Sequence, residues 1–328
     1  MANDGLLSSG LSRVTHNKRY IFWFWLLNLT LAEFGTAAFR RSAHAILDRS
    51  LEAERLAKGF DLGVVIGMVM RPDFGTTNSM TTPALYFACI FFLATAIFMP
   101  GIFAGYASTY RLPREEFFRA CGRNLWRFIR IMLVAGILMG VVAVLLFAAN
   151  SALADKAGES TNETLPFEVR MTGLAIIFLI MTVFRIWFDL AEVDTVLSDQ
   201  RAVRKSIAVA FKHTFGSLGR LLATYVASTI VAAIFLVGGL WVWLRFVAPE
   251  NHLGAFILAQ IILFLLLIPR FWQRGIAVSY WEQKMLAPIP LTLPLETAPI
   301  FAAPSPAPAT PEPAPTAPTA PPTREGTN

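Results

Sequence analysis

The chain has 328 residues, of which 55% are hydrophobic and only 15% are charged. Because a soluble domain typically carries about 25% charged residues, this composition excludes an ordinary soluble protein and indicates that much of the chain faces lipid. The formal net charge is +6; in such a chain positive charge sets topology and meets anionic lipid, so nucleic acid is not expected as a partner.

Six apolar stretches are long enough to cross a bilayer, whose core of about 30 Å needs roughly 20 residues of helix. In chain order they cover residues 21–39, 84–106, 131–149, 171–191, 221–247 and 253–268. The last is short, but Phe271 and Trp272 extend it through Pro269. A further stretch, 62–70, is too short to span, and we expect it at the interface or packed against the bundle. The predicted fold is all-α, a polytopic transmembrane helical bundle of about six spans.

Two polar residues stand out in the first span, Asn28 and Glu33. Glu33 lies about 18 Å along this span, past the midplane. A carboxylate at that depth is costly, so Asn28 and Glu33 form a candidate intramembrane polar site. The alternative is that Glu33 is neutral, or pairs with Arg40, Arg41 or another helix, and we favour such packing over a functional role.

An amphipathic helix is predicted directly before the third span. One face carries Phe117, Cys121, Leu125 and Phe128. The opposite face carries a stripe of Arg119, Arg123, Arg127 and Arg130. This pattern is typical of a cytoplasmic interfacial helix, with the stripe as candidate contact for anionic phospholipid headgroups. A similar helix precedes the fifth span, with an apolar arc of Val203, Ile207, Phe211, Phe215 and Leu218 beside Arg201, Lys205 and Lys212. The favoured alternative is topology determination with passive lipid contact.

Three glycine pairs have GxxxG spacing: Gly63/Gly67, Gly101/Gly105 and Gly136/Gly140. Because a missing side chain lets two helix backbones approach closely, we expect these pairs to serve packing within the bundle rather than dimerisation.

The fourth span ends in a candidate interfacial charge cluster of Arg185, Asp189 and Glu192. Arg185 and Asp189 are an i,i+4 pair, and Glu192 continues the same face. With Asp194 these carboxylates offer an alternative Mg²⁺ site for phospholipid chemistry, but a charge-paired helix end is favoured. The four histidines are scattered, and no catalytic or cofactor motif is present. We therefore predict no metal, no cofactor and no catalytic residue.

Basic residues favour one orientation of the bundle. The N-terminal segment, the second and fourth connections and the C-terminal part together carry 18 Lys and Arg, and the alternate connections carry nine. This asymmetry predicts that both termini are cytoplasmic. A cleaved signal peptide over residues 1–38 is the weaker alternative, since polar residues interrupt its apolar run.

The last part of the chain has a different composition. Thirteen of the 20 prolines follow Ala287. A segment rich in Pro, Ala and Thr cannot bury a core, so we divide the chain into a helical domain, 1–286, and a disordered cytoplasmic tail, 287–328.

The chain resembles bacterial polytopic membrane proteins of unassigned role. It is also distantly similar to the membrane domain attached to some bacterial glycerophosphodiester phosphodiesterases. The segments that carry this resemblance are 50–56, 59–61 and 117–120, together with the basic helix 201–220. The resemblance implies a bacterial inner membrane; it implies no phosphodiesterase activity, because that domain is missing.

These features favour a non-enzymatic membrane protein that serves assembly, envelope organisation or lipid contact. The first alternative is a small-molecule or lipid transporter, which a water-filled cavity reaching Glu33 would support. The second is a lipid-modifying enzyme that uses Asp189, Glu192 and Asp194.

Overall fold

The computed structural model describes residues 5–48, 50, 52–58, 61–75, 80–160, 162, 164–248 and 251–285, and the predicted tail lies outside them. Every regular element in these ranges is a helix. The α-helices are α1 (Leu6–His16), α2 (Arg19–Gly35), α3 (Ala37–Leu47), α4 (Glu52–Lys58), α5 (Leu62–Val69), α6 (Thr82–Ala107), α7 (Arg114–Ala157), α8 (Leu165–Leu197), α9 (Val203–Gly216), α10 (Leu218–Phe246) and α11 (His252–Tyr280). A 3₁₀ turn, η1 (Pro72–Phe74), and a π-turn, η3 (Trp281–Met285), complete the elements.

Six helical segments in the described ranges are long and apolar enough to cross a membrane. They are α2 continued by α3, then α6, α7, α8, α10 and α11 with η3. This confirms the predicted all-α polytopic bundle, and the chain is an integral membrane protein. The sixth span continues through Pro269, as expected from the sequence.

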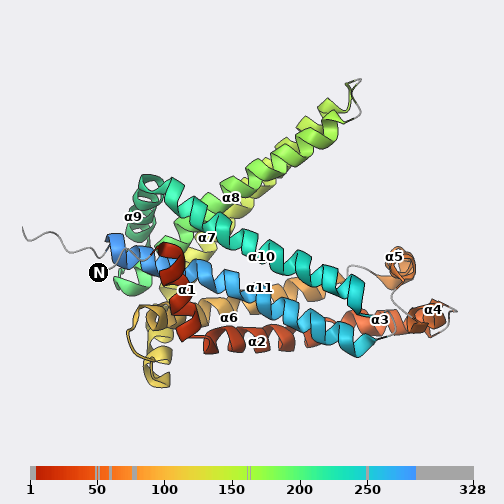
Figure 1. Ribbon diagram of the computed structural model, residues 1–328, viewed down its shortest axis with the longest axis horizontal. Coiled ribbons are helices and arrows are strands. Elements are labelled where there is room, and N and C mark those ends of the chain that lie inside the picture. Colours follow the sequence, from red (N-terminus) through yellow and green to blue (C-terminus); the bar gives the residue numbers. More distant parts are fainter. Residues whose placement is uncertain are drawn as a thin grey trace, which may run out of the picture. The chain divides into compact units, whose positions relative to one another are not determined.

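The predicted interfacial helix before the third span is not a separate element. It forms the first part of α7, which runs without a break for 44 residues (Figure 1). Proline is the strongest helix breaker, and this region has Pro113 at the N-cap and no proline inside the helix. The amphipathic segment and the third span therefore form one continuous helix.

The first span bends where α2 meets α3. The Thr36 hydroxyl donates to the carbonyls of Ala32, at 3.0 Å, and Glu33, at 3.2 Å. Such bonds compete with the helical ladder and bend helices. Beyond the bend, Met68 and Phe74 pack on Ala43 of α3 in a small separate core. The short stretch 62–70 thus packs on the end of the first span.

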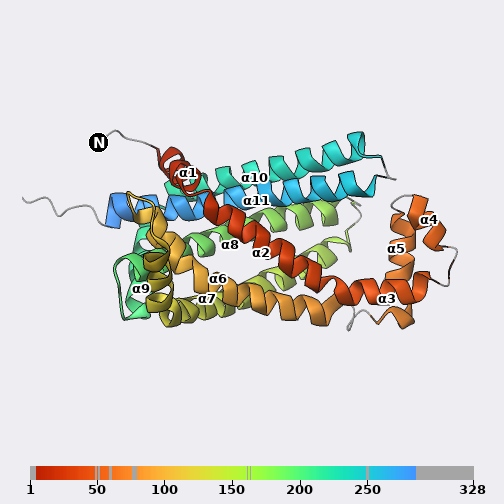
Figure 2. The ribbon, with the colours of Figure 1, turned by 90° about the horizontal axis from the view of Figure 1, so that it is seen from below.

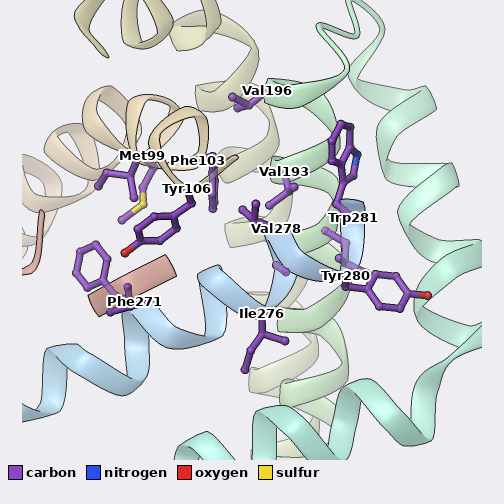
Figure 3. Close-up of a cluster of buried hydrophobic side chains, with 14 of the residues drawn as sticks. Met99, Phe103, Tyr106, Val193, Val196, Phe271, Ile276, Val278, Tyr280 and Trp281 are labelled. Carbon is purple, nitrogen blue, oxygen red and sulfur yellow. The ribbon is translucent and has the colours of Figure 1, made fainter. Parts of the chain in front are cut away.

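The main core lies where α2, α6, α8 and α11 meet. Met99, Phe103 and Tyr106 of α6 pack with Phe271 of α11, and Val193 of α8 belongs to the same cluster (Figure 3). Tyr106 and Phe271 are each 1% exposed. These residues lie near the ends of the membrane spans. The apolar runs of the sequence predicted the positions of these spans correctly.

Glycines make two of the close helix crossings. A Cβ on Gly275 of α11 would lie 2.6 Å from the carbonyl oxygen of Gly10 on α1. A Cβ on Gly101 of α6 would lie 2.6 Å from Cys121 Sγ on α7. The second case agrees with the expected packing role of the Gly101/Gly105 pair. Gly136 and Gly140, by contrast, have no atom within 4 Å of a built Cβ.

The short helix α1 is tied to the end of α11, against which it lies (Figure 2). Arg13 donates to both carboxylate oxygens of Glu282, to Ser279 Oγ at 2.9 Å and to the carbonyl of Tyr106. The indole N–H of Trp272 donates to the Leu7 carbonyl at 2.9 Å. The N-terminal segment, the end of α6 and the end of α11 therefore meet at one end of the bundle. This agrees with six spans, because the second and the sixth span then end on the side where the chain begins.

Candidate functional site

A cavity of about 560 Å³ lies between α2, α8, α10 and α11. Its polar lining residues are Asn28, Arg185, Thr229, Gln260, Arg270 and Gln273. The rest of the wall is apolar, including Leu29, Leu263 and Leu266. Ligand cavities in proteins typically measure about 300–1,000 Å³ and combine an apolar wall with a few convergent polar groups. This cavity has both properties.

The cavity lies within the membrane-spanning part of the bundle. Arg270 precedes the end of α11 by ten residues, which places it about 15 Å along the helix from Tyr280. Arg270 follows the apolar run 253–268 by two residues and so lies toward the end of the sixth span. Polar and charged groups in membrane-spanning helices are costly and mark functional sites by default. Packing of the apolar spans alone does not account for six of them in one place.

A hydrogen-bonded network adjoins the cavity wall. The Tyr225 hydroxyl lies 3.0 Å from Asp189 Oδ2 and 3.2 Å from the Gln273 carbonyl. The Gln273 amide donates to Ser228 Oγ at 2.9 Å and to Thr229 Oγ1 at 3.1 Å. Tyr225 and Ser228 are fully buried. Because each of these polar groups has a partner, the network holds α8, α10 and α11 in fixed register around the cavity.

The charges around the cavity are unequal. Arg185 lies 3.8 Å from Asp189, and Glu192 and Arg274 belong to the same charged group. Two carboxylates and two guanidinium groups thus belong to this group. Arg270 is a third cation, and the charged groups that act on it are Arg274 and Arg185. In the described ranges Arg270 makes no hydrogen bond and no ion pair.

The chain matches no protein-family model, no curated protein and no solved structure. The resemblance to the phosphodiesterase-linked membrane domain stays a prediction from the sequence.

The two residues of the candidate intramembrane polar site are separated. Asn28 lines the cavity, whereas Glu33 lies outside it on an exposed face. Glu33 Oε1 is 2.8 Å from Arg40 across the bend between α2 and α3. Pairing of Glu33 with Arg40 is one of the alternatives to a functional role that the sequence offered. The cavity does not reach Glu33.

Of the candidate charge cluster, Arg185 lines the cavity, whereas Asp189, 3.8 Å from Arg185, and Glu192 do not. The sequence showed its members on α8 but not their neighbours on other helices, because Tyr225 and Arg274 lie far away along the chain. Asp194 has different partners, Ser198 Oγ at 2.8 Å and Trp281 Nε1 at 3.2 Å. Across the residues that the structure describes, no three His, Cys, Asp or Glu side chains form a metal-binding group.

Arg119, Arg123 and Arg130 of the stripe are exposed and Arg127 is half-buried, and all four have partners in the chain. Arg127 lies 2.6 Å and Arg123 3.9 Å from Asp199. Arg119 pairs with Glu115 at 2.6 Å, and the Arg130 guanidinium lies over the Trp126 ring. The apolar face of this segment packs on protein, since Cys121 and Phe128 are 3% and 0% exposed.

The second amphipathic helix, α9, packs through a face that sequence periodicity did not indicate. Its buried residues are Ser206, Ala210 and Thr214, whereas Phe211 and Phe215 of the apolar arc are 46% and 50% exposed. Small residues allow α9 to lie close to its neighbours. The exposed phenylalanines beside Lys212 keep the amphipathic surface that an interfacial helix presents to lipid.

Proposed function

We propose that this integral membrane protein binds an amphiphile in the cavity between α2, α8, α10 and α11, and acts in lipid contact or lipid transfer. The observation that carries this proposal is the set of six polar residues lining a cavity of about 560 Å³ inside apolar spans. An apolar wall with several polar groups suits a molecule with a polar head and a hydrocarbon chain. The proposal includes no enzymatic step.

A cavity-filling variant tests the proposal. Ala232 of α10 lines the cavity, and its neighbour Ala233 is exposed. Ala232→Phe places a ring in the cavity and should displace the amphiphile, whereas Ala233→Phe adds the same ring to the outer surface. We expect wild type and Ala233→Phe to retain an amphiphile through purification, at a ratio near one per chain, and Ala232→Phe to lose it. Mass spectrometry of extracted lipids measures the ratio; equal retention by all three proteins would contradict the proposal.

The basic end of the bundle supports the second part of the proposal, contact with anionic headgroups of a bacterial inner membrane. The arginine stripe and the exposed face of α9 carry the charge for this contact. Both termini are then cytoplasmic. Reporter fusions after Pro113 and Ser206 should give cytoplasmic signals, and fusions after Asp155 and Asn251 should give signals from the opposite side. The reverse pattern at Asp155 and Ser206 would contradict this orientation.

A further inference from the structure

We propose that the cavity selects an amphiphile with an acidic headgroup, a phosphate or a carboxylate, and that Arg270 together with Arg185 binds this group. This inference rests on the proposed function and names the class of ligand.

The first support for an acidic headgroup is the excess of positive charge in the cavity lining. The cavity lining contains two arginines and no Asp or Glu among its residues. Arg185 is partly balanced by Asp189 at 3.8 Å, but Arg270 has cations as its charged neighbours. A cation inside a membrane span is retained where it pairs with an anion or contacts a ligand. An acidic headgroup supplies the missing negative charge, while a cationic headgroup would add repulsion.

The cavity lining contains groups of a kind that binds acids. A guanidinium group presents parallel N–H donors that match the two oxygens of a carboxylate or phosphate. Asn28 and Gln260 add amide donors to the lining, and neither makes a hydrogen bond in the part of the chain that the structure describes. The indole N–H of Trp25, another lining residue, is also buried without a partner.

The apolar wall distinguishes an amphiphile from a free anion. Leucines of α2 and α11 form much of the lining. A free phosphate ion would gain nothing from these side chains, whereas a hydrocarbon chain can pack against them. The same acidic group attached to a chain should therefore bind more tightly than the free ion.

The test uses the full-length protein in nanodiscs of zwitterionic lipid. The probes are dodecyl phosphate, dodecanoate and dodecanol, which share one chain length, together with inorganic phosphate as the free anion. The affinity of each probe is measured by calorimetry at neutral pH. We expect wild type to bind the two acidic amphiphiles at least about tenfold more tightly than dodecanol, which corresponds to about 1.4 kcal/mol.

Two variants assign this preference to Arg270. Arg270→Gln should remove most of the preference for the acidic probes over dodecanol. Arg245→Gln is the matched control, because Arg245 is exposed at the end of α10 and does not line the cavity. This control should keep the full preference.

The outcomes separate the inference from the proposed function. Equal binding of dodecanol and dodecyl phosphate to wild type would overturn the inference but leave an amphiphile cavity in place. This comparison needs no variant, so a folding defect in Arg270→Gln leaves the inference testable. Binding of inorganic phosphate as tight as that of dodecyl phosphate would overturn the assignment to an amphiphile and identify a free anion. Absence of binding for every probe would contradict the proposed function itself.

Discussion

The contact between α1 and α11 depends on two residues that lack side chains. A Cβ on Gly275 would lie 2.6 Å from the carbonyl oxygen of Gly10, which is closer than a carbon and an oxygen atom tolerate. We expect Gly275→Ala to destabilise the protein by about 1–3 kcal/mol, the range typical of overpacked interiors. Gly140→Ala on α7 is the control; it meets no atom within 4 Å and should be neutral or slightly stabilising. Thermal unfolding in detergent measures both, and equal melting temperatures would show that α1 is free to move away.

At the scale of elements, Asp199 links the connection after α8 to α7. Arg127 donates to its carboxylate at 2.6 Å, and this bond, together with the charge of Arg123, holds the pKa of Asp199 below its ordinary value. Asp199 also has a positive φ of 49°, a conformation that Asn tolerates nearly as well as Asp. The ion pair can therefore be removed by Asp199→Asn without straining the backbone.

A carboxyl group whose pKa is lower in the folded state stabilises the fold above its unfolded pKa of about 3.9 and loses this contribution as the pH falls through the folded value. We therefore expect wild type to melt at a higher temperature than Asp199→Asn at pH 6, and the difference to shrink as the pH falls below about 3.9 and through the lower pKa of the folded state. Melting curves of the two proteins between pH 3 and pH 7 measure this. A difference that stays constant over the whole range would show that the carboxylate charge does not contribute.

Element boundaries show what sequence patterns predict and what they do not. Hydropathy located all six spans, because a run of about 20 apolar residues has few stable positions other than the membrane core. It did not show that the amphipathic segment and the third span form the single helix α7, since that depends on the absence of a break. It also did not identify the packing face of α9, where small residues such as Ala210 decide how closely helices approach.

On the scale of the whole molecule, the candidate site combines predictable and unpredictable parts. Asn28, Arg185 and Asp189 were conspicuous in the sequence, because polar residues stand out in apolar spans. Tyr225 and Gln273 were not, since a tyrosine or a glutamine near a span end has many ordinary positions. Their role follows from contacts across 36 and 48 positions of sequence, between Tyr225 and Asp189 and between Tyr225 and Gln273. Periodicity within one helix carries no information about such contacts.

The central claim is that a hydrocarbon chain enters the cavity beside Trp25. The most direct measurement is quenching of tryptophan fluorescence by dodecyl phosphate brominated along its chain, in nanodiscs of zwitterionic lipid. We predict saturable quenching of wild type that unbrominated dodecyl phosphate reverses, and a clearly smaller saturable component in Trp25→Phe, because bromine quenches tryptophans that it contacts. Saturable quenching of the same size in wild type and Trp25→Phe would contradict the account, since the chain would then bind away from the cavity.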